Sequence, residues 1–257
     1  MSAETVVAYE DSFRSSSAVR EYADGFGGGM FMSALWDLEK EALARSQVLA
    51  RANGKGSYLD FACGHGRVSG LLAPRFTSAI GVDISEAMVA LAREVHPTLT
   101  FVSGDITASP SVLDGRSAFD VISVFRFLPQ AAPNVRLNVL RKLVEHLAPE
   151  GILVINNNAN RTSALWPALV TRSVVRRESV RQLLNRRTLA HRHLERLLAD
   201  LGLEVVEVEP ASYLPETIAR RLPRRAWLAL ERRLIRAGIG ASFATDQVVI
   251  ARRISAS

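Results

Sequence analysis

Three acidic residues and one loop of small residues form the part of this sequence that could do chemistry. The stretch Y-L-D-F-A-C-G-H-G-R-V-S-G, residues 58–70, carries Asp60 inside a short apolar run that ends in a glycine-rich turn. Asp83 and Asp105 each follow a later apolar run. Buried carboxylates need polar partners, so three of them at successive strand ends predict a polar ligand lying across one edge of a sheet.

The loop from Ala62 to Gly66 precedes a helix that the sequence predicts from about residue 67. The free N–H groups and dipole of a helix N-terminus favour partial negative charge, and glycines let a ligand approach the backbone. Asp83 would suit the two hydroxyls of a ribose, and Asp105 would suit an adenine amino group. A plain strand-to-helix turn is the simpler alternative for the loop itself.

Other glycine-loop sites fit this sequence less well. A dinucleotide-binding loop would have its third glycine at the position of Ser69, and its first strand ordinarily has no acid where Asp60 stands. A P-loop is excluded because no Gly-Lys-Ser/Thr follows the loop. Cys63 and His65 lack further ligands at suitable spacing, so no metal is expected, and both are interpreted as packing residues.

Short apolar runs alternate with amphipathic helices around these residues. This alternation predicts an α/β fold: a doubly wound, mostly parallel, seven-stranded sheet with helices on both faces. Helices are expected from about 67, over 86–95 and over about 133–147, and Gly202 is expected to end another. The expected strands are 57–62, 79–83, 100–105, 119–125, 151–157, 203–209 and 245–253.

The whole chain, residues 1–257, is expected to form one domain with three parts. Residues 1–52 are predicted to be a helical N-terminal lid, in which Tyr22 closes the site and the glycines at 27–29 permit movement. A fixed helix packed beside the sheet is the alternative. Residues 53–160 form the expected cofactor-binding half, and 161–257 the acceptor-side half, with two basic helical insertions over 161–187 and 210–244.

Four motifs in this order resemble the class I S-adenosylmethionine-dependent methyltransferases over roughly residues 55–160. They are D-F-A-C-G-H-G-R, G-V-D-I-S, S-G-D-I and F-D-V-I-S-V-F. The resemblance implies S-adenosyl-L-methionine as the cofactor and a Rossmann-like fold. It also implies cofactor-binding roles for Asp60, Ala62, Gly64 and Gly66 at the methionine part, Asp83 and Ile84 at the ribose and the flank of the adenine, Asp105 and Ile106 at the adenine, and Phe125 at the methyl-bearing side.

Two residues are candidates for catalysis. Arg126, between two phenylalanines after the fourth strand, could grip a carboxylate or phosphate through its planar guanidinium, or could pair with an acid of the N-terminal segment. His191 could act as a base, whereas His96 and His146 are expected to be solvated. Asn156, Asn157 and Asn158 end the fifth strand at the same mouth and could bind a polar acceptor or satisfy loop backbone.

Charge and composition bound the partners. Residues 161–257 hold 18 arginines and no lysine against nine acidic residues, which favours an anionic or carrier-bound small-molecule acceptor or peripheral membrane contact. Nucleic acid is disfavoured because interleaved aromatics are missing. No apolar run reaches about 20 residues and the chain has one cysteine, so we expect a cytoplasmic protein.

The expected function is methyl transfer to oxygen or nitrogen of a polar metabolite. The alternative is a regulatory or scaffold module that binds the cofactor without turnover and docks on membrane or nucleic acid through its basic C-terminal part.

Overall fold

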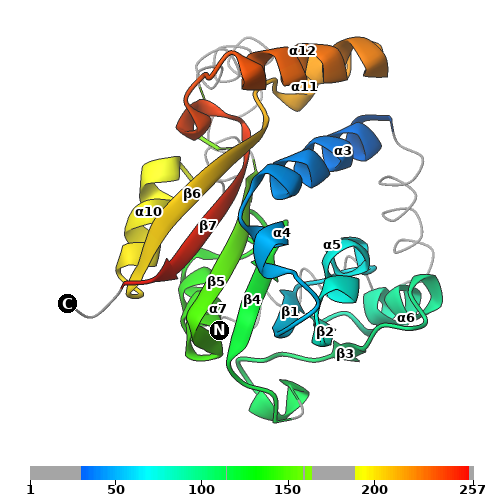
Figure 1. Cartoon of the computed structure of the whole chain (residues 1–257), viewed down its shortest axis with the longest axis vertical. Coiled ribbons are helices and arrows are strands. Elements are labelled where there is room, and N and C mark those ends of the chain that lie inside the picture. Colours follow the sequence, from blue (N-terminus) through cyan, green and yellow to red (C-terminus); the bar gives the residue numbers. More distant parts are fainter. Residues whose placement is uncertain (1–29, 114, 159, 164–188, 255–257) are drawn as a thin grey trace.

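Seven strands form one sheet in the computed structural model, which describes residues 30–113, 115–158, 160–163 and 189–254 (Figure 1). The strand order is β3-β2-β1-β4-β5-β7-β6. The strands are β1 (Ser57–Phe61), β2 (Ser78–Asp83), β3 (Phe101–Ser103), β4 (Phe119–Val124), β5 (Leu147–Asn158), β6 (Leu203–Ser212) and β7 (Asp246–Arg253).

The sheet is mostly parallel, as the sequence predicted. Strands β1 to β5 pair in parallel, and β7 runs antiparallel to both β5 and β6. Strand order reverses between β1 and β4, which lie side by side although two strands separate them in the chain. Ligands of such sheets bind beyond the carboxyl ends of the strands at this reversal. The fold therefore puts the loop after β1 and the segment after β4 at one place.

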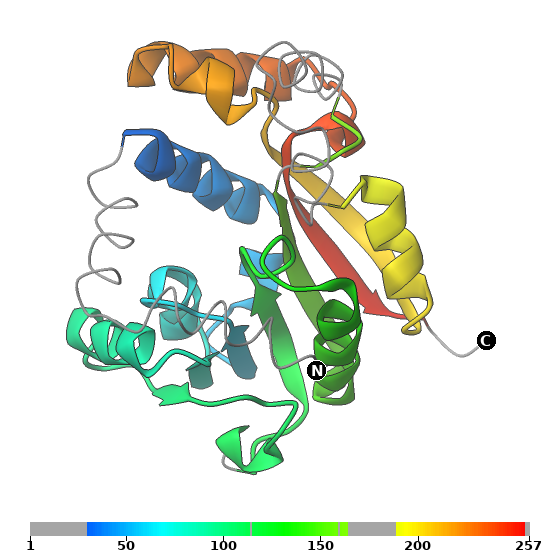
Figure 2. The same ribbon diagram turned by 180° about the vertical axis from the view of Figure 1, so that it is seen from behind.

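Helices cover both faces (Figure 1 and Figure 2). Side chains of α3 (Met30–Arg45), α4 (Val48–Arg51) and α5 (Arg67–Leu72) pack on one face with those of β1, β5 and β7. Side chains of α7 (Pro133–Glu145) and α10 (His191–Ala199) pack on the other. Helix α6 (Glu86–Val95) packs beside β3 and the loop after β1. Leu, Ile and Val fill both layers, as expected for strands buried on two sides.

Helix α3 lies between the sheet and the C-terminal helices (Figure 1). Helices α11 (Glu216–Ala219) and α12 (Arg224–Arg236) follow β6, and the Phe31 and Trp227 rings stack with centroids 5.0 Å apart. The described ranges also contain three short 3-10 helices: η1 (Ala73–Arg75), η2 (Pro110–Leu113) and η3 (Ala241–Phe243). Among the helices of the described ranges, none has the length and apolar character to cross a membrane.

Several boundaries differ from the sequence prediction. The fifth strand begins at Leu147 instead of 151, because Leu147 already pairs with Phe119 of β4. The third strand ends at Ser103, so Asp105 lies in the turn beyond it rather than at its last position. The predicted helical character of residues 1–29, the glycine joint at 27–29 and most of the insertion 161–187 lie outside the described residues.

Candidate cofactor and acceptor site

The loop between β1 and α5 has an unusual backbone. Ala62, Gly64 and Gly66 have φ angles of 56°, 54° and 83°, all in the left-handed region that favours glycine. A Cβ atom added to Gly64 would meet no heavy atom within 4 Å, so this side of the loop is open. A Cβ atom added to Gly66 would lie 2.9 Å from the rings of His96 and Phe101. Gly64 thus leaves room for a ligand, whereas Gly66 lets neighbouring rings pack.

Asp60 lies buried below this loop. Its Oδ2 accepts a hydrogen bond from Ser69 Oγ at 2.6 Å, and its Oδ1 accepts one from Ser123 Oγ at 2.7 Å. Burial raises the pKa of Asp60 to about 6, although both hydroxyl bonds lower it. Ser69 and Ser123 were not among the predicted site residues. Their nearness follows only from the pairing of β1 with β4 and from the turn into α5.

Asp83 ties the loop to the end of β2. Its Oδ2 accepts from Gly64 N at 2.8 Å, and its Oδ1 accepts from Ser85 N at 2.9 Å. A carboxylate has about four lone-pair positions, so these two bonds leave capacity for ligand hydroxyls. Burial raises the pKa of Asp83 against the lowering effect of these backbone bonds. The structure therefore brings the predicted ribose-binding acid next to the open side of the loop.

Asp105 stands beside Asp83 at the same edge. Gly104 N donates to the Asp83 carbonyl oxygen at 2.9 Å, which holds the two turns together. Asp105 is half-buried, and its Oδ1 accepts from Thr107 N and Thr107 Oγ1 at 2.8 and 2.7 Å. The Ile106 side chain is fully buried in the core, so any contact it makes with an adenine would come from its backbone. Ile84 is half-buried, and Phe125 is buried at the end of β4.

Cys63 and His65, the other residues of the loop, are interpreted as packing residues and not as a nucleophile or a base. Cys63 is buried against Val89, Ala92 and Phe101, and burial raises the pKa of its thiol well above the ordinary value, so it stays protonated. Burial lowers the pKa of His65 to about 4, so this imidazole is neutral at pH 7. The expectation that His96 and His146 are solvated was wrong, because both are half-buried. The His96 ring fills the space over Gly66 and Gly70.

Arg126 follows β4 with a φ of 59° and donates from Nη2 to Glu39 Oε1 at 2.7 Å. Arg67 donates from Nη1 to the other Glu39 oxygen at 2.6 Å, and its guanidinium lies 4.2 Å from the Trp36 ring centroid. Glu39 is fully buried; burial alone would raise its pKa, but Arg126 and Arg67 hold it below its ordinary value. The interpretation of Arg126 as a partner of an N-terminal acid is therefore confirmed, and its catalytic role stays a prediction.

A second polar group lies where β5 ends and β7 begins. Asn156 Nδ2 donates to Asp246 Oδ1 at 2.8 Å, and both residues are buried. Along β5 the side chains alternate: Val154 packs on the α3 face, and Ile155 on the α10 face. Asn156 therefore faces α3, the helix that carries Glu39. Sequence reasoning named Asn156 but missed Asp246 and Glu39, although an acid on the apolar stripe of a helix was a readable signal for Glu39.

His191 lies on the other face of the sheet. It begins α10, and its Nδ1 is 3.3 Å from Gln247 Oε1, which also accepts from Asn157 Nδ2 at 3.0 Å. Its Nε2 lies 3.2 Å from Glu195 Oε1. His191 is buried whereas His193 is exposed, as expected for two residues that cannot share a helix face. The structure thus does not bring His191 together with Arg126, and Tyr22 lies outside the described residues.

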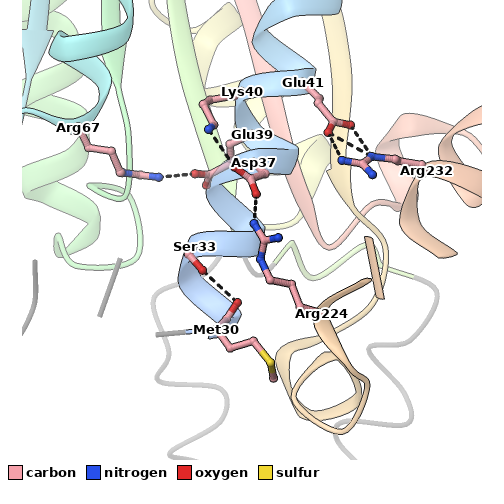
Figure 3. Close-up of polar contacts among 9 residues, drawn as sticks. All are labelled: Met30, Ser33, Asp37, Glu39, Lys40, Glu41, Arg67, Arg224 and Arg232. Atoms are coloured by element: carbon pink, nitrogen blue, oxygen red, sulfur yellow. Dashed lines mark hydrogen bonds and ion pairs between the residues drawn. The ribbon is translucent and has the colours of Figure 1, made fainter. Parts of the chain in front are cut away.

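The arginines of the second insertion pair with α3 (Figure 3). Arg224 contacts Asp37, and Arg232 Nη2 lies 2.6 Å from Glu41 Oε1. From the opposite side of α3, Arg67 reaches Glu39 (Figure 3). These pairs use basic charge that the sequence analysis assigned to an anionic acceptor. Among the described residues, no group of three His, Cys, Asp or Glu side chains could hold a metal ion.

Comparison with known proteins agrees with this geometry. A family model described as "Methyltransferase domain" matches residues 59–151. The chain is 30% identical over 201 residues to a ubiquinone biosynthesis O-methyltransferase of Pseudomonas paraeruginosa, covering 71% of this chain and 83% of that protein. Its fold is similar to that of magnesium protoporphyrin IX methyltransferase from Synechocystis with bound SAH, with a TM-score of 0.64, 16% identity and coverage of 96% and 99%.

The chain belongs to the class I S-adenosylmethionine-dependent methyltransferases. It is also 37% identical over 108 residues to a trans-aconitate 2-methyltransferase of Delftia acidovorans. That match covers 41% of this chain and 39% of the relative, so the chain spans well under half of that relative's length. S-Adenosylmethionine is the cofactor of the family, and the open loop beside Asp83 fits it.

Proposed function

We propose that this protein transfers a methyl group from S-adenosylmethionine to an oxygen or nitrogen atom of a small-molecule acceptor. The observation that carries the proposal is the edge formed by Gly64, Asp83 and Asp105. There an open glycine lies beside a buried carboxylate whose backbone bonds hold the loop in place.

Different residues of this edge would bind different parts of the cofactor. Asp83 would accept from the ribose hydroxyls, and Asp105 from the adenine amino group, because both carboxylates stand at adjacent turns. Asp60 and the loop from Ala62 to Gly66 would hold the methionine part, whose ammonium group matches the buried carboxylate below. The cofactor supplies a methyl group on a sulfonium sulfur, ready for in-line displacement.

The acceptor would then lie next to Phe125 and Arg126, beyond β4. This position is at the reversal of strand order, one strand from the glycine loop. Methyl transfer depends mainly on the alignment of acceptor, methyl and sulfur, so the chief task of these residues is to position the acceptor. Arg126 pairs with Glu39, and its planar guanidinium could orient an acceptor.

Relatives support a small-molecule acceptor, since one is named for trans-aconitate and another for ubiquinone biosynthesis. The N-terminal lid with Tyr22, the carrier-bound or anionic character of the acceptor and the peripheral membrane contact remain proposals. Because α3 already pairs with Arg224 and Arg232, the basic charge of α12 serves at least in part to hold α3.

The test is a methyl-transfer assay with labelled S-adenosylmethionine and a panel of hydroxyl, amine and carboxylate metabolites. We expect labelled product from at least one acceptor and its loss in Asp83→Ala. The control is Asp200→Asn, which changes an exposed acid at the end of α10. Tight S-adenosylhomocysteine binding without any labelled product would support the regulatory alternative. No binding at all would contradict the cofactor assignment.

A further inference from the structure

The side-chain amide of Asn156 has a fixed orientation. Its Nδ2 lies 2.8 Å from Asp246 Oδ1 and 3.4 Å from the Gln247 carbonyl oxygen. A backbone carbonyl oxygen and an ionised carboxylate can only accept hydrogen bonds. Flipping the amide would place oxygen against oxygen, so Oδ1 must point the other way. Among the described residues, no donor reaches Asn156 Oδ1, although the side chain is fully buried.

A buried carbonyl oxygen without a donor is costly, since it has lost water and gained nothing in return. Asn156 stands near the carboxyl end of β5, on the face covered by α3, where the acceptor is proposed to lie. An acceptor bound at this position could donate the hydrogen bond that Asn156 Oδ1 lacks. The same amide holds Asp246, so the two side chains form one rigid recognition group.

Asp246 adds a carboxylate to this group. It begins β7 opposite Asn158, its side chain is buried, and Asn156 is its hydrogen-bond donor within the described residues. Burial raises the pKa of Asp246 to about 7, against the effect of Arg126, while Glu39 raises it further and Arg67 lowers it. The carboxylate is therefore near its midpoint at neutral pH and can either accept or release a proton.

The two positive charges nearby, Arg126 and Arg67, are balanced when Asp246 is ionised and acts as a second carboxylate beside Glu39. Arg126 and Arg67 each give an Nη group to Glu39, which is fully buried between them. The contact that a ligand would meet at Asn156 and Asp246 is consequently made of oxygen atoms with lone pairs. A hydroxyl or amine can donate to these atoms, whereas a carboxylate would set its own lone pairs against them.

We propose that Asn156 and Asp246 bind the methyl acceptor through a hydroxyl or amine group, which makes the acceptor a hydrogen-bond donor rather than a carboxylate. This inference rests on the proposed methyl transfer and names its acceptor class. The inference predicts an acceptor whose chemistry differs from that of trans-aconitate, the acid named for several relatives.

The reaction balances with these groups. The lone pair of the acceptor oxygen or nitrogen forms the new bond to the methyl carbon as the sulfur–carbon bond of S-adenosylmethionine breaks. The sulfur keeps that electron pair and becomes the neutral thioether of S-adenosylhomocysteine. The proton of the hydroxyl or amine passes to the Asp246 carboxylate, and from there to water.

The experiment measures binding of three probes to the protein saturated with S-adenosylhomocysteine: catechol, glucosamine and trans-aconitate. Calorimetry on the wild type is compared with Asp246→Asn and Asn156→Ala, and with the exposed control Asp200→Asn. We expect catechol or glucosamine to bind more tightly than trans-aconitate. Asp246→Asn should weaken that binding at least tenfold, Asn156→Ala should weaken it severalfold, and Asp200→Asn should not change it.

Affinity for S-adenosylhomocysteine separates the two proposals. It should stay within twofold of wild type in all three variants, and its absence from the wild type would defeat the proposed function instead. Should Asp246→Asn fail to bind the cofactor product, Asn156→Ala carries the comparison. The inference is overturned if trans-aconitate binds best or if neither catechol nor glucosamine binds. It is also overturned if these two probes bind equally well to the wild type, Asp246→Asn and Asn156→Ala.

Discussion

Buried acids are held in different ways in the two halves of the site: the cofactor half, at the ends of β1, β2 and β3, and the acceptor half, where α3 and the ends of β4 and β5 meet the start of β7. In the cofactor half, Asp60 and Asp83 bond to groups that lie close in the chain or on the neighbouring strand, such as Ser69 and Ser85. In the acceptor half, Glu39 meets Arg126 across 87 residues, and Asp246 meets Asn156 across 90. The first half is built mainly from residues close in the chain, with Ser123 of β4 as the exception. The second half exists only after helix α3 and strand β7 have docked.

This difference has a physical consequence for how each half responds to change. Acids of the cofactor half bond mainly to neutral backbone and hydroxyl groups, which compensate the carboxylate in part. Glu39 is matched by two full charges in the protein interior, where an unbalanced charge is far more costly. We expect loss of one charge in the acceptor half to lower the free energy of unfolding most. In the cofactor half, we expect loss of an acid to weaken cofactor binding.

The largest effect is expected from Glu39→Gln. This change leaves Arg67 and Arg126 next to each other without their buried counterion, and loss of one partner of a buried pair costs about 3–5 kcal/mol. The free energy of unfolding in urea should fall by that amount. Glu41→Gln, on the same helix but in a partly exposed pair with Arg232, should cost below about 1 kcal/mol. Equal losses in the two variants would contradict the buried role of Glu39.

The next effect concerns pH. Asp60 has a pKa of about 6 and Asp246 a pKa of about 7, both raised by burial above the ordinary aspartate value of 3.8. Between 3.8 and the raised value the folded state binds more protons than the unfolded state, so the free energy of unfolding falls as pH rises. At about 1.4 kcal/mol per unit, the Asp60 contribution is on the order of 2–3 kcal/mol.

The two halves should separate by pH window. Asp60→Asn should remove the decline in stability between about pH 4 and 6, and Asp246→Asn should remove a decline that continues to about pH 7. Urea unfolding of wild type and both variants from pH 4 to 8 measures this. If the free energy of unfolding rose from pH 4 to 8 by the same amount in the wild type and both variants, neither acid would be buried as described.

A smaller effect is expected from Asp83→Ala on cofactor affinity. The variant loses the acceptor of Gly64 N and Ser85 N together with the proposed ribose bonds. S-Adenosylhomocysteine should bind about 1.5–3 kcal/mol more weakly by calorimetry. Asp105→Ala should have an effect in the same direction. Unchanged affinity in both variants would remove the assignment of this edge to the cofactor.

The smallest effect is expected where α12 meets α3. Arg224 and Arg232 form pairs that are partly exposed, so Arg224→Ala and Arg232→Ala should each lower the free energy of unfolding by less than about 1 kcal/mol. High salt should reduce the difference from wild type. Binding of acceptor probes should stay unchanged in both variants. A large loss of acceptor binding in either variant would indicate that these arginines bind the acceptor.

The same contrast explains what the sequence could predict. The sheet, its mostly parallel order and the turn from Ala62 to Gly66 depend on apolar runs and on spacing within about 50 residues, and all three were readable. The site edge around Asp60 and Asp83 was readable for the same reason. Ser123 was not, because its place depends on the register between β1 and β4.

The acceptor half was harder to predict because its contacts are long-range. Asn156 was named from its position at a strand end, but its partner Asp246 could not be found without knowing that β7 pairs with β5. Arg126 was correctly given an N-terminal acid as one partner, and only the docking of α3 identifies that acid as Glu39. His96 was misplaced because nothing in the sequence shows that its ring covers Gly70.

The most direct test of the central claim is a crystal structure of the protein with S-adenosylhomocysteine. We predict that the ligand lies over the carboxyl ends of β1, β2 and β3 and contacts the protein backbone at Gly64. Its ribose hydroxyls should bond to Asp83, and its adenine should lie beside Asp105. Its sulfur should point toward Phe125 and the Asn156–Asp246 pair. A ligand bound elsewhere, or one with its sulfur turned away from the end of β4, would contradict the account.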